Sequence, residues 1–162
     1  MLYISELDIK AKIKKYKNDI NPVKINEFPD EIRQALSEFQ DSIGLGEEAV
    51  DEVGNKIGDK IISDTYLEVA YDLLSQEQLS KAKVFCEEAA RLDKENPLVY
   101  KCLASIWFEK QNYNKALVEL NKAKRLFVQK KMSKEANEID LFINRIPVSS
   151  QIIHLIEKLF IK

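Results

Sequence analysis

The chain has 162 residues, of which only 4 are glycine and 4 are proline, and no segment sustains the alternation of polar and apolar residues typical of strands, so an all-α fold is predicted. Its formal net charge of -2 argues against a general nucleic-acid binder, which needs a basic face. The longest apolar-rich run, residues 152–161, is too short and too charged to span a membrane, and the first residues lack the apolar core of a signal peptide.

Residues 1–28 are predicted to be an N-terminal extension, either mobile or folded back into a groove of the chain itself. Asn21-Pro22 and the acidic onset at Pro29 mark its boundary. The apolar residues that could fill a groove are Leu2, Ile4, Leu7, Ile13 and Tyr16. The extension is also rich in lysine, which is typical of a solvated helix face; the alternative is a contact with the acidic residues 29–63. These lysines are Lys10, Lys12, Lys14, Lys15 and Lys17.

Residues 29–62 carry 9 acidic and 3 basic groups and are predicted to form two helices. Pro29-Asp30-Glu31 opens the first, whose apolar side holds Ile32, Ala35, Leu36 and Phe39. Glu47-Glu48 begins the second, with Val50, Val53, Ile57 and Ile61 on one stripe. Gly54 and Gly58 in this helix favour close packing against a neighbouring helix over a dimerisation seam.

Residues 63–96 and 97–130 repeat one pattern at a spacing of 34 residues without a gap. They agree at 8 of 34 positions, against roughly two expected by chance. Large residues of each first helix fall at i, i+3 and i+7 on one stripe, and the alanines stand where two backbones approach closely. The identical pairs are Tyr66/Tyr100, Ala70/Ala104, Lys81/Lys115, Ala82/Ala116, Val84/Val118, Ala89/Ala123, Arg91/Arg125 and Leu92/Leu126.

The repeated pattern resembles the tetratricopeptide repeat (TPR) family, which has this length and this order of aromatic and small residues. The second stretch carries Tyr100, Leu103, Ala104, Trp107, Tyr113, Ala116, Leu120 and Ala123 at the matching positions. The resemblance implies antiparallel helix-turn-helix repeats stacked as a short right-handed superhelix. Residues 29–62 fall in phase with them and are interpreted as a degenerate repeat. The family's closing proline is absent at Lys94 and Val128, so the last repeat helix is expected to run past Phe127.

Residues 131–162 are predicted to form two capping helices, because the end of a repeat array exposes one face of its core. The first runs from Ser133 to Asn144, and the second follows Pro147. The second is apolar around much of its circumference, so it could alternatively join two copies as a homodimer. Its apolar residues are Ile152, Ile153, Leu155, Ile156, Leu159 and Phe160.

No set of residues in the sequence supports catalysis, a metal site or a cofactor. The single histidine, His154, has no acid–base companion nearby in sequence, and one histidine with two separated cysteines lacks metal-ligand spacing. Cys86 and Cys102 are expected to be free thiols of a reducing compartment, which favours a cytoplasmic protein. The chain is therefore predicted not to be an enzyme.

The resemblance to the TPR family also implies a binding surface, because the first helix of each repeat in that family lines a concave groove. Carried over residue by residue, the partner-binding positions are Leu67, Tyr71, Leu74, Leu98, Lys101, Ser105 and Phe108. The carboxylate-binding Lys, Asn and Arg of chaperone-binding repeats are missing here, since Leu67, Tyr71 and Cys102 occupy such positions. The expected partner is an apolar helix or extended segment of another protein. The predicted function is an adaptor or dedicated chaperone; the alternative is a structural subunit of a stable complex or homo-oligomer.

Overall fold

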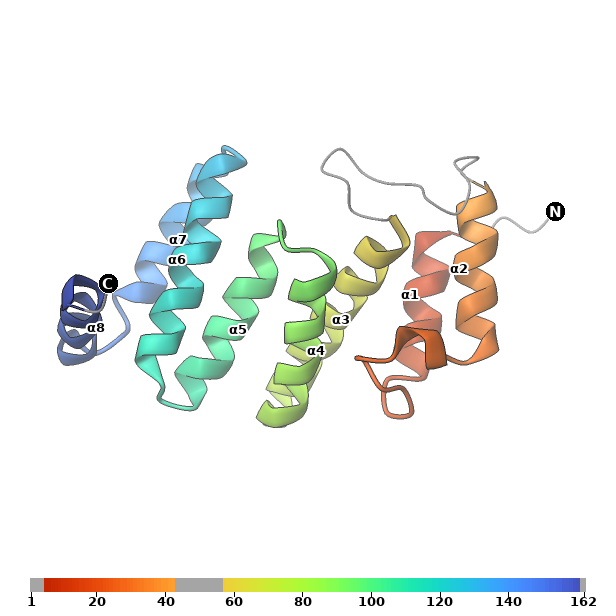
Figure 1. Ribbon diagram of the computed structural model, residues 1–162, viewed down its shortest axis with the longest axis horizontal. Coiled ribbons are helices and arrows are strands. Elements are labelled where there is room, and N and C mark those ends of the chain that lie inside the picture. The colour runs from red at the N-terminus through yellow and green to blue at the C-terminus, as the bar shows by residue number, and fades with distance from the viewer. Residues whose placement is uncertain (1–4, 43–56, 161–162) are drawn as a thin grey trace. The chain divides into compact units, whose positions relative to one another are not determined.

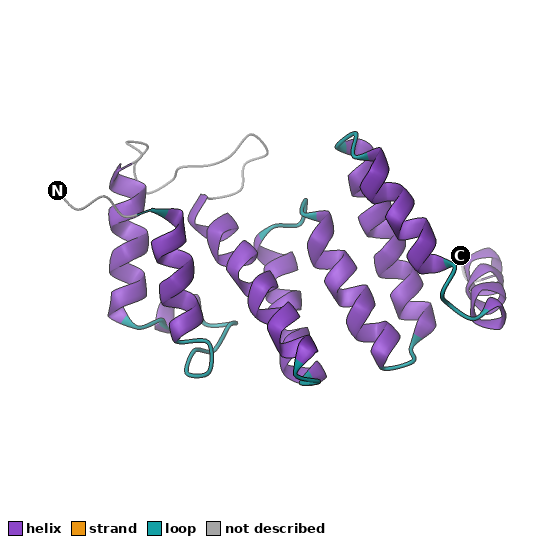
Figure 2. Ribbon diagram, turned by 180° about the vertical axis from the view of Figure 1, so that it is seen from behind, coloured by secondary structure: helices purple, strands orange, loops and turns teal. Residues whose placement is uncertain are grey.

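A computed structural model describes residues 5–42 and 57–160, and within these ranges every regular element is helical (Figures 1 and 2). The all-α prediction is confirmed for this part of the chain. The predicted helix start at Glu47 and the glycine Gly54 lie outside the described residues. The chain divides into two compact units, unit 1 from Met1 to Asp93 and unit 2 from Lys94 to Lys162. Unit 1 holds the first matching stretch except for its last three residues, and unit 2 holds the second.

Unit 1 contains α1 (Glu6–Lys15), α2 (Asp30–Ser42), α3 (Ile57–Ser75) and α4 (Leu79–Leu92), with a short 3₁₀ turn, η1 (Ile25–Glu27), before α2. A capping box opens α1: Ser5 Oγ accepts from the Asp8 amide at 3.2 Å, and the Asp8 carboxylate accepts from the Ser5 amide at 2.9 Å. Asp30 and Glu31 lie in the first turn of α2, where their charge suits the helix dipole.

The core of unit 1 is centred on Tyr66 of α3, which is fully buried. Its ring meets Phe85 of α4 edge-on at 5.2 Å and Phe28 at 6.4 Å, and its hydroxyl donates to the Pro22 carbonyl at 3.0 Å. Burial raises the pKa of Tyr66, so this hydroxyl stays protonated as a donor. The aromatic stripe of the first repeat therefore packs against the N-terminal segment as well as against α4.

Residues 1–28 are not a separate extension, and that boundary prediction is wrong. Ile9 and Ile13 of α1 are fully buried, and Phe28 is 2% exposed. The segment before Pro29 thus supplies apolar side chains to the core of unit 1. The predicted boundary between residues 62 and 63 is also wrong, because α3 continues from Ile57 to Ser75 through it.

Helix α1 pairs with both α2 and α3. The C-terminal end of α1 meets the first turn of α2, where Lys12 and Tyr16 bind Glu31, so these two helices form an antiparallel hairpin. On α3, Lys10 and Lys14 pair with Glu68. Among the described residues, the helix pair that precedes α3–α4 is therefore α1–α2. The sequence pattern had indicated residues 29–62, of which residues 43–56 lie outside the described part of the chain.

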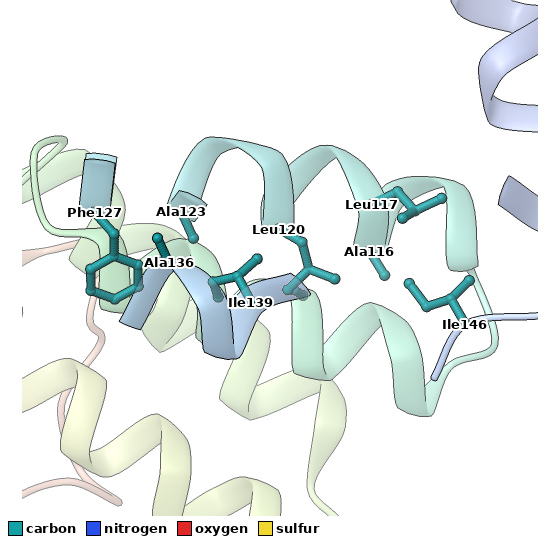
Figure 3. Close-up of a cluster of buried hydrophobic side chains, with 9 residues drawn as sticks. Ala116, Leu117, Leu120, Ala123, Phe127, Ala136, Ile139 and Ile146 are labelled. Atoms are coloured by element: carbon teal, nitrogen blue, oxygen red, sulfur yellow. The ribbon is translucent and has the colours of Figure 1, made fainter. Parts of the chain in front are cut away.

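Unit 2 contains α5 (Pro97–Glu109), α6 (Tyr113–Gln129), α7 (Ser133–Ile143) and α8 (Val148–Phe160). Asn96 caps α5 by accepting from the Leu98 amide, and Pro97 occupies the first turn, where its missing amide costs nothing. As predicted, α6 runs past Phe127. The core of this unit (Figure 3) joins α5, α6 and α7 through Ala104, Ala116, Leu117, Leu120, Ala123, Phe127, Ala136, Ile139 and Ile146.

The turns that close α3 and α5 have the same backbone geometry 34 residues apart. Glu77 and Gln111 take left-handed conformations, with φ of 60° and 59°. The amide after each donates to the carbonyl five residues earlier at 2.9 Å, from Gln78 to Leu73 and from Asn112 to Trp107. This is the Schellman pattern of a helix C-terminus. The period of the sequence is therefore also a period of the backbone.

A third left-handed residue, Lys131, ends α6 with φ of 58°. Lys131→Gly is expected to raise the free energy of unfolding of unit 2 by up to about 1 kcal/mol, because glycine has no Cβ to strain this conformation. Asn121→Gly in the exposed middle of α6 is the control and should lower the free energy of unfolding by about 0.3 kcal/mol, because asparagine is itself a poor helix former. Urea denaturation of both variants measures the difference, and a loss of stability in Lys131→Gly would contradict the prediction.

Candidate functional site

The predicted binding residues of unit 1 lie on α3, and the structure separates them by exposure. Leu67 is only 6% exposed and belongs to the core, so its assignment to a binding surface is wrong. Tyr71, one turn later, is 39% exposed, and Leu74 is half-buried. Leu67 is buried because α3 has packed neighbours on more than one side, namely α1, α2 and α4. The accessible part of this surface is therefore Tyr71 with the edge of Leu74.

The predicted binding residues of unit 2 lie along α5. Leu98 in the first turn is 43% exposed, and Lys101 and Ser105 are half-buried. The Ser105 hydroxyl donates to the Lys101 carbonyl at 3.1 Å, so it satisfies its hydrogen bond within the helix. Leu98 offers the largest apolar contact among these three residues.

Phe108 is half-buried and packs within unit 2. Its ring meets Tyr113 at 5.6 Å and Phe142 at 5.5 Å, both edge-on. The Arg145 guanidinium lies 5.5 Å from the centres of both the Phe108 and Phe142 rings. A charged substitution at Phe108 would disturb this cluster and with it the folding of unit 2.

Electrostatic contacts between α1 and the rest of unit 1 centre on two carboxylates. Glu31 of α2 accepts from the Tyr16 hydroxyl at 2.6 Å and from Lys12 at 3.0 Å, and Lys15 lies 3.4 Å away. The hydrogen bond from Tyr16, followed by that from Lys12, lowers the pKa of Glu31 from 4.5 to about 2. The contact between the lysines and the acidic block, which was the alternative to a solvated face, is thus confirmed for Glu31.

The second carboxylate, Glu68 of α3, was not recognised from sequence. It pairs with Lys14 and, at 3.6 Å, with Lys10, and the hydrogen bond from Lys14 lowers the pKa of Glu68. The sequence signal that could have found it is the spacing of the lysines. Lys10 and Lys14 are four residues apart and share one side of α1, while Lys12 and Lys15 share the other.

Protonation of the Glu31 carboxylate should contribute to a loss of stability in acid. Because its folded-state pKa lies below the unfolded value of 4.5, its contribution is present above pH 4.5 and is lost as the pH falls toward about 2. Glu31→Gln is therefore expected to be less stable than the wild type at neutral pH, and the difference should vanish between these two pH values. Urea unfolding of both proteins across this range measures it; a constant difference would contradict the assignment.

Apolar side chains are also exposed on α8, the last helix of unit 2. Val148, Leu155, Ile156, Leu159 and Phe160 are 49–81% exposed. Gln151 ties the start of the helix to α7, because its amide donates to the carbonyls of Ile143 and Ile146. The helix itself packs on α6. The side chains of Ile152, Ile153 and His154 lie outside the described residues.

The described ranges 5–42 and 57–160 contain neither a group of metal ligands nor a membrane-spanning helix. No three His, Cys, Asp or Glu side chains there are grouped as a metal site would require. None of the helices in these ranges combines the length and the apolarity needed to cross a membrane. Cys86 and Cys102 are buried free thiols.

No family model matches the sequence, and no curated protein and no solved structure matches it significantly.

Proposed function

We propose that this chain is a protein-interaction module of the tetratricopeptide type, acting as a cytoplasmic adaptor or dedicated chaperone for one partner protein. The observation that carries the proposal is the 34-residue period, which recurs in the side-chain pattern and in the turns at Glu77 and Gln111. The antiparallel pairs α1–α2, α3–α4 and α5–α6 add support, since paired helices are the building unit of such repeats.

The proposed contact residues are one exposed position in each unit, Tyr71 on α3 of unit 1 and Leu98 on α5 of unit 2. On the same helices Leu74, Lys101 and Ser105 are half-buried. An aromatic side chain and a leucine that remain accessible to solvent suit an apolar helix or extended segment of a partner. Leu67 is buried in unit 1 and Phe108 packs within unit 2, so neither is included among the proposed contact residues.

Matched charge substitutions test these two contact residues. Tyr71→Glu and Leu98→Glu each place a charge at an exposed apolar position, and Val118→Glu on α6 is the control, since Val118 is exposed to the same degree (41%). Affinity capture from source cells with quantitative mass spectrometry should find a protein that wild type and Val118→Glu retain. The other two variants should retain about tenfold less. Equal loss in all three variants, or no loss in folded Tyr71→Glu and Leu98→Glu, would contradict the proposal.

A structural subunit is the second candidate, and the exposed apolar side chains of α8 favour it. Five exposed apolar residues on a 13-residue helix form more apolar surface than a capping helix needs. If α8 joins two copies, sedimentation equilibrium should show a dimer that Phe160→Glu converts to monomer. Leu141→Glu on α7, which is exposed to a similar degree, should leave the dimer intact. A monomeric wild type would contradict this candidate.

A further inference from the structure

Helix α1 is attached to unit 1 through few buried side chains. Only two of its ten residues, Ile9 and Ile13, are buried. By comparison, α4 buries five of its fourteen residues and joins α3 through a three-residue turn. The remaining contacts of α1 that the structure defines are ion pairs and hydrogen bonds between exposed or partly buried groups, which solvent and salt weaken.

The contacts of α1 follow a simple chemical pattern. Residues 9–16 read Ile-Lys-Ala-Lys-Ile-Lys-Lys-Tyr, with the two isoleucines one turn apart. One row of lysines, Lys10 and Lys14, faces Glu68 of α3. The other row, Lys12 and Lys15, faces Glu31 of α2. The buried stripe of Ile9 and Ile13 is thus flanked by two rows of lysines, each of which pairs with one carboxylate.

From this arrangement we propose that α1 is a displaceable helix, and that the face of α2 and α3 beneath it binds a helix of the same chemistry from a partner protein. The partner helix would carry two aliphatic residues four positions apart and lysines on both flanks. Charge complementarity with Glu31 and Glu68 selects such a helix against an acidic or neutral one. This rests on the proposed protein-binding function and adds a second surface and the class of segment that it accepts.

Displacement requires that α1 detach while the rest of unit 1 stays folded. Local opening costs less free energy than global unfolding where few apolar contacts are broken. Hydrogen exchange of the wild-type protein measures this directly. The amides of α1 should exchange faster than those of α3 and α4, and added salt should speed exchange in α1 alone. Exchange of all three helices at one common rate would overturn the proposal.

Binding in trans is tested with a fluorescent peptide of residues 5–20 and the full chain. In Lys10→Glu/Lys14→Glu the pairs with Glu68 become repulsions and no buried side chain changes. The peptide should bind this variant at least about tenfold more tightly than wild type, because α1 no longer occupies the face. Lys130→Glu/Lys134→Glu in unit 2 has the same net charge and should behave as wild type, which excludes nonspecific attraction.

The peptide itself has a matched control. Replacing Ile9 and Ile13 by serine in the peptide keeps its charge, and this version should not bind. No binding of the unmodified peptide to a folded Lys10→Glu/Lys14→Glu chain would overturn the proposal, as would equal binding of both peptides. Exchange of α1 between two wild-type copies would give a dimer. That result would show that the face binds a second copy of this chain, and it would overturn the proposal that the face binds a different protein. None of these experiments involves Tyr71 or Leu98, so their failure is distinguishable from failure of the proposed binding surface.

Discussion

Phe85→Ala should lower the free energy of unfolding of the protein by about 3–5 kcal/mol. Phe85 is 1% exposed and packs edge-on against the buried ring of Tyr66. Truncation to alanine removes a large apolar side chain from water-free surroundings and leaves a cavity beside Tyr66, which α3 and α4 cannot close without moving their backbones. Denaturant unfolding followed by circular dichroism measures the loss. Hydrogen exchange should show that the loss of protection is greatest in α3 and α4.

The adjacent residue provides the control for this prediction. Val84 faces solvent on α4 and is 40% exposed, so Val84→Ala should change the stability by less than about 0.5 kcal/mol. Comparable losses in the two variants would mean that the orientation of α4 is wrong. They would also undermine the repeat alignment, because Val84 and Val118 are equivalent exposed positions in it.

The helical class and the helices of the two matching stretches could be predicted from the sequence because their signals are local. The stripe of Tyr66, Val69 and Leu73 and the small residues Ala70 and Ala82 mark helices that bury one face, and the observed burial agrees. The turns could not be predicted from local residues in the same way. Glu77 and Gln111 take left-handed conformations, and neither is the glycine that usually occupies such a position.

The N-terminal helix could not be assigned to the core from local pattern. Residues 6–15 bury only Ile9 and Ile13, and a long connection containing Pro22 and Pro29 separates them from α2. The 34-residue period therefore aligned residues 29–62 with the repeats, although α1 is the helix that pairs with α2. Only tertiary contacts, such as that of Tyr66 with Pro22, reveal this arrangement.

Of the residues predicted to bind a partner, Tyr71 and Leu98 are 39% and 43% exposed, and their role in binding stays a prediction. Leu67 is buried because α3 packs against more than one neighbouring helix. A periodic apolar stripe in the sequence predicts burial against one neighbour only. Phe108 packs within unit 2 because Phe142 and Arg145 contact its ring. These two residues lie more than thirty positions later in the chain, so no local pattern predicts the contact.

Ile139→Asp should destabilise unit 2 by about 4 kcal/mol or more, since it places an unpaired charge in an apolar core. Ile139 is fully buried in the cluster that joins α7 to α5 and α6 (Figure 3). Leu141→Asp is the matched control: the same change two residues along α7, at a side chain that is 66% exposed, should cost less than about 0.5 kcal/mol. Trp107, which packs against the same cluster, is the fluorescence probe for urea unfolding. If Ile139→Asp kept the wild-type urea midpoint of unfolding, α7 would be a cap that the rest of unit 2 does not need. The expected loss of stability would instead show that α7 is part of the unit 2 core.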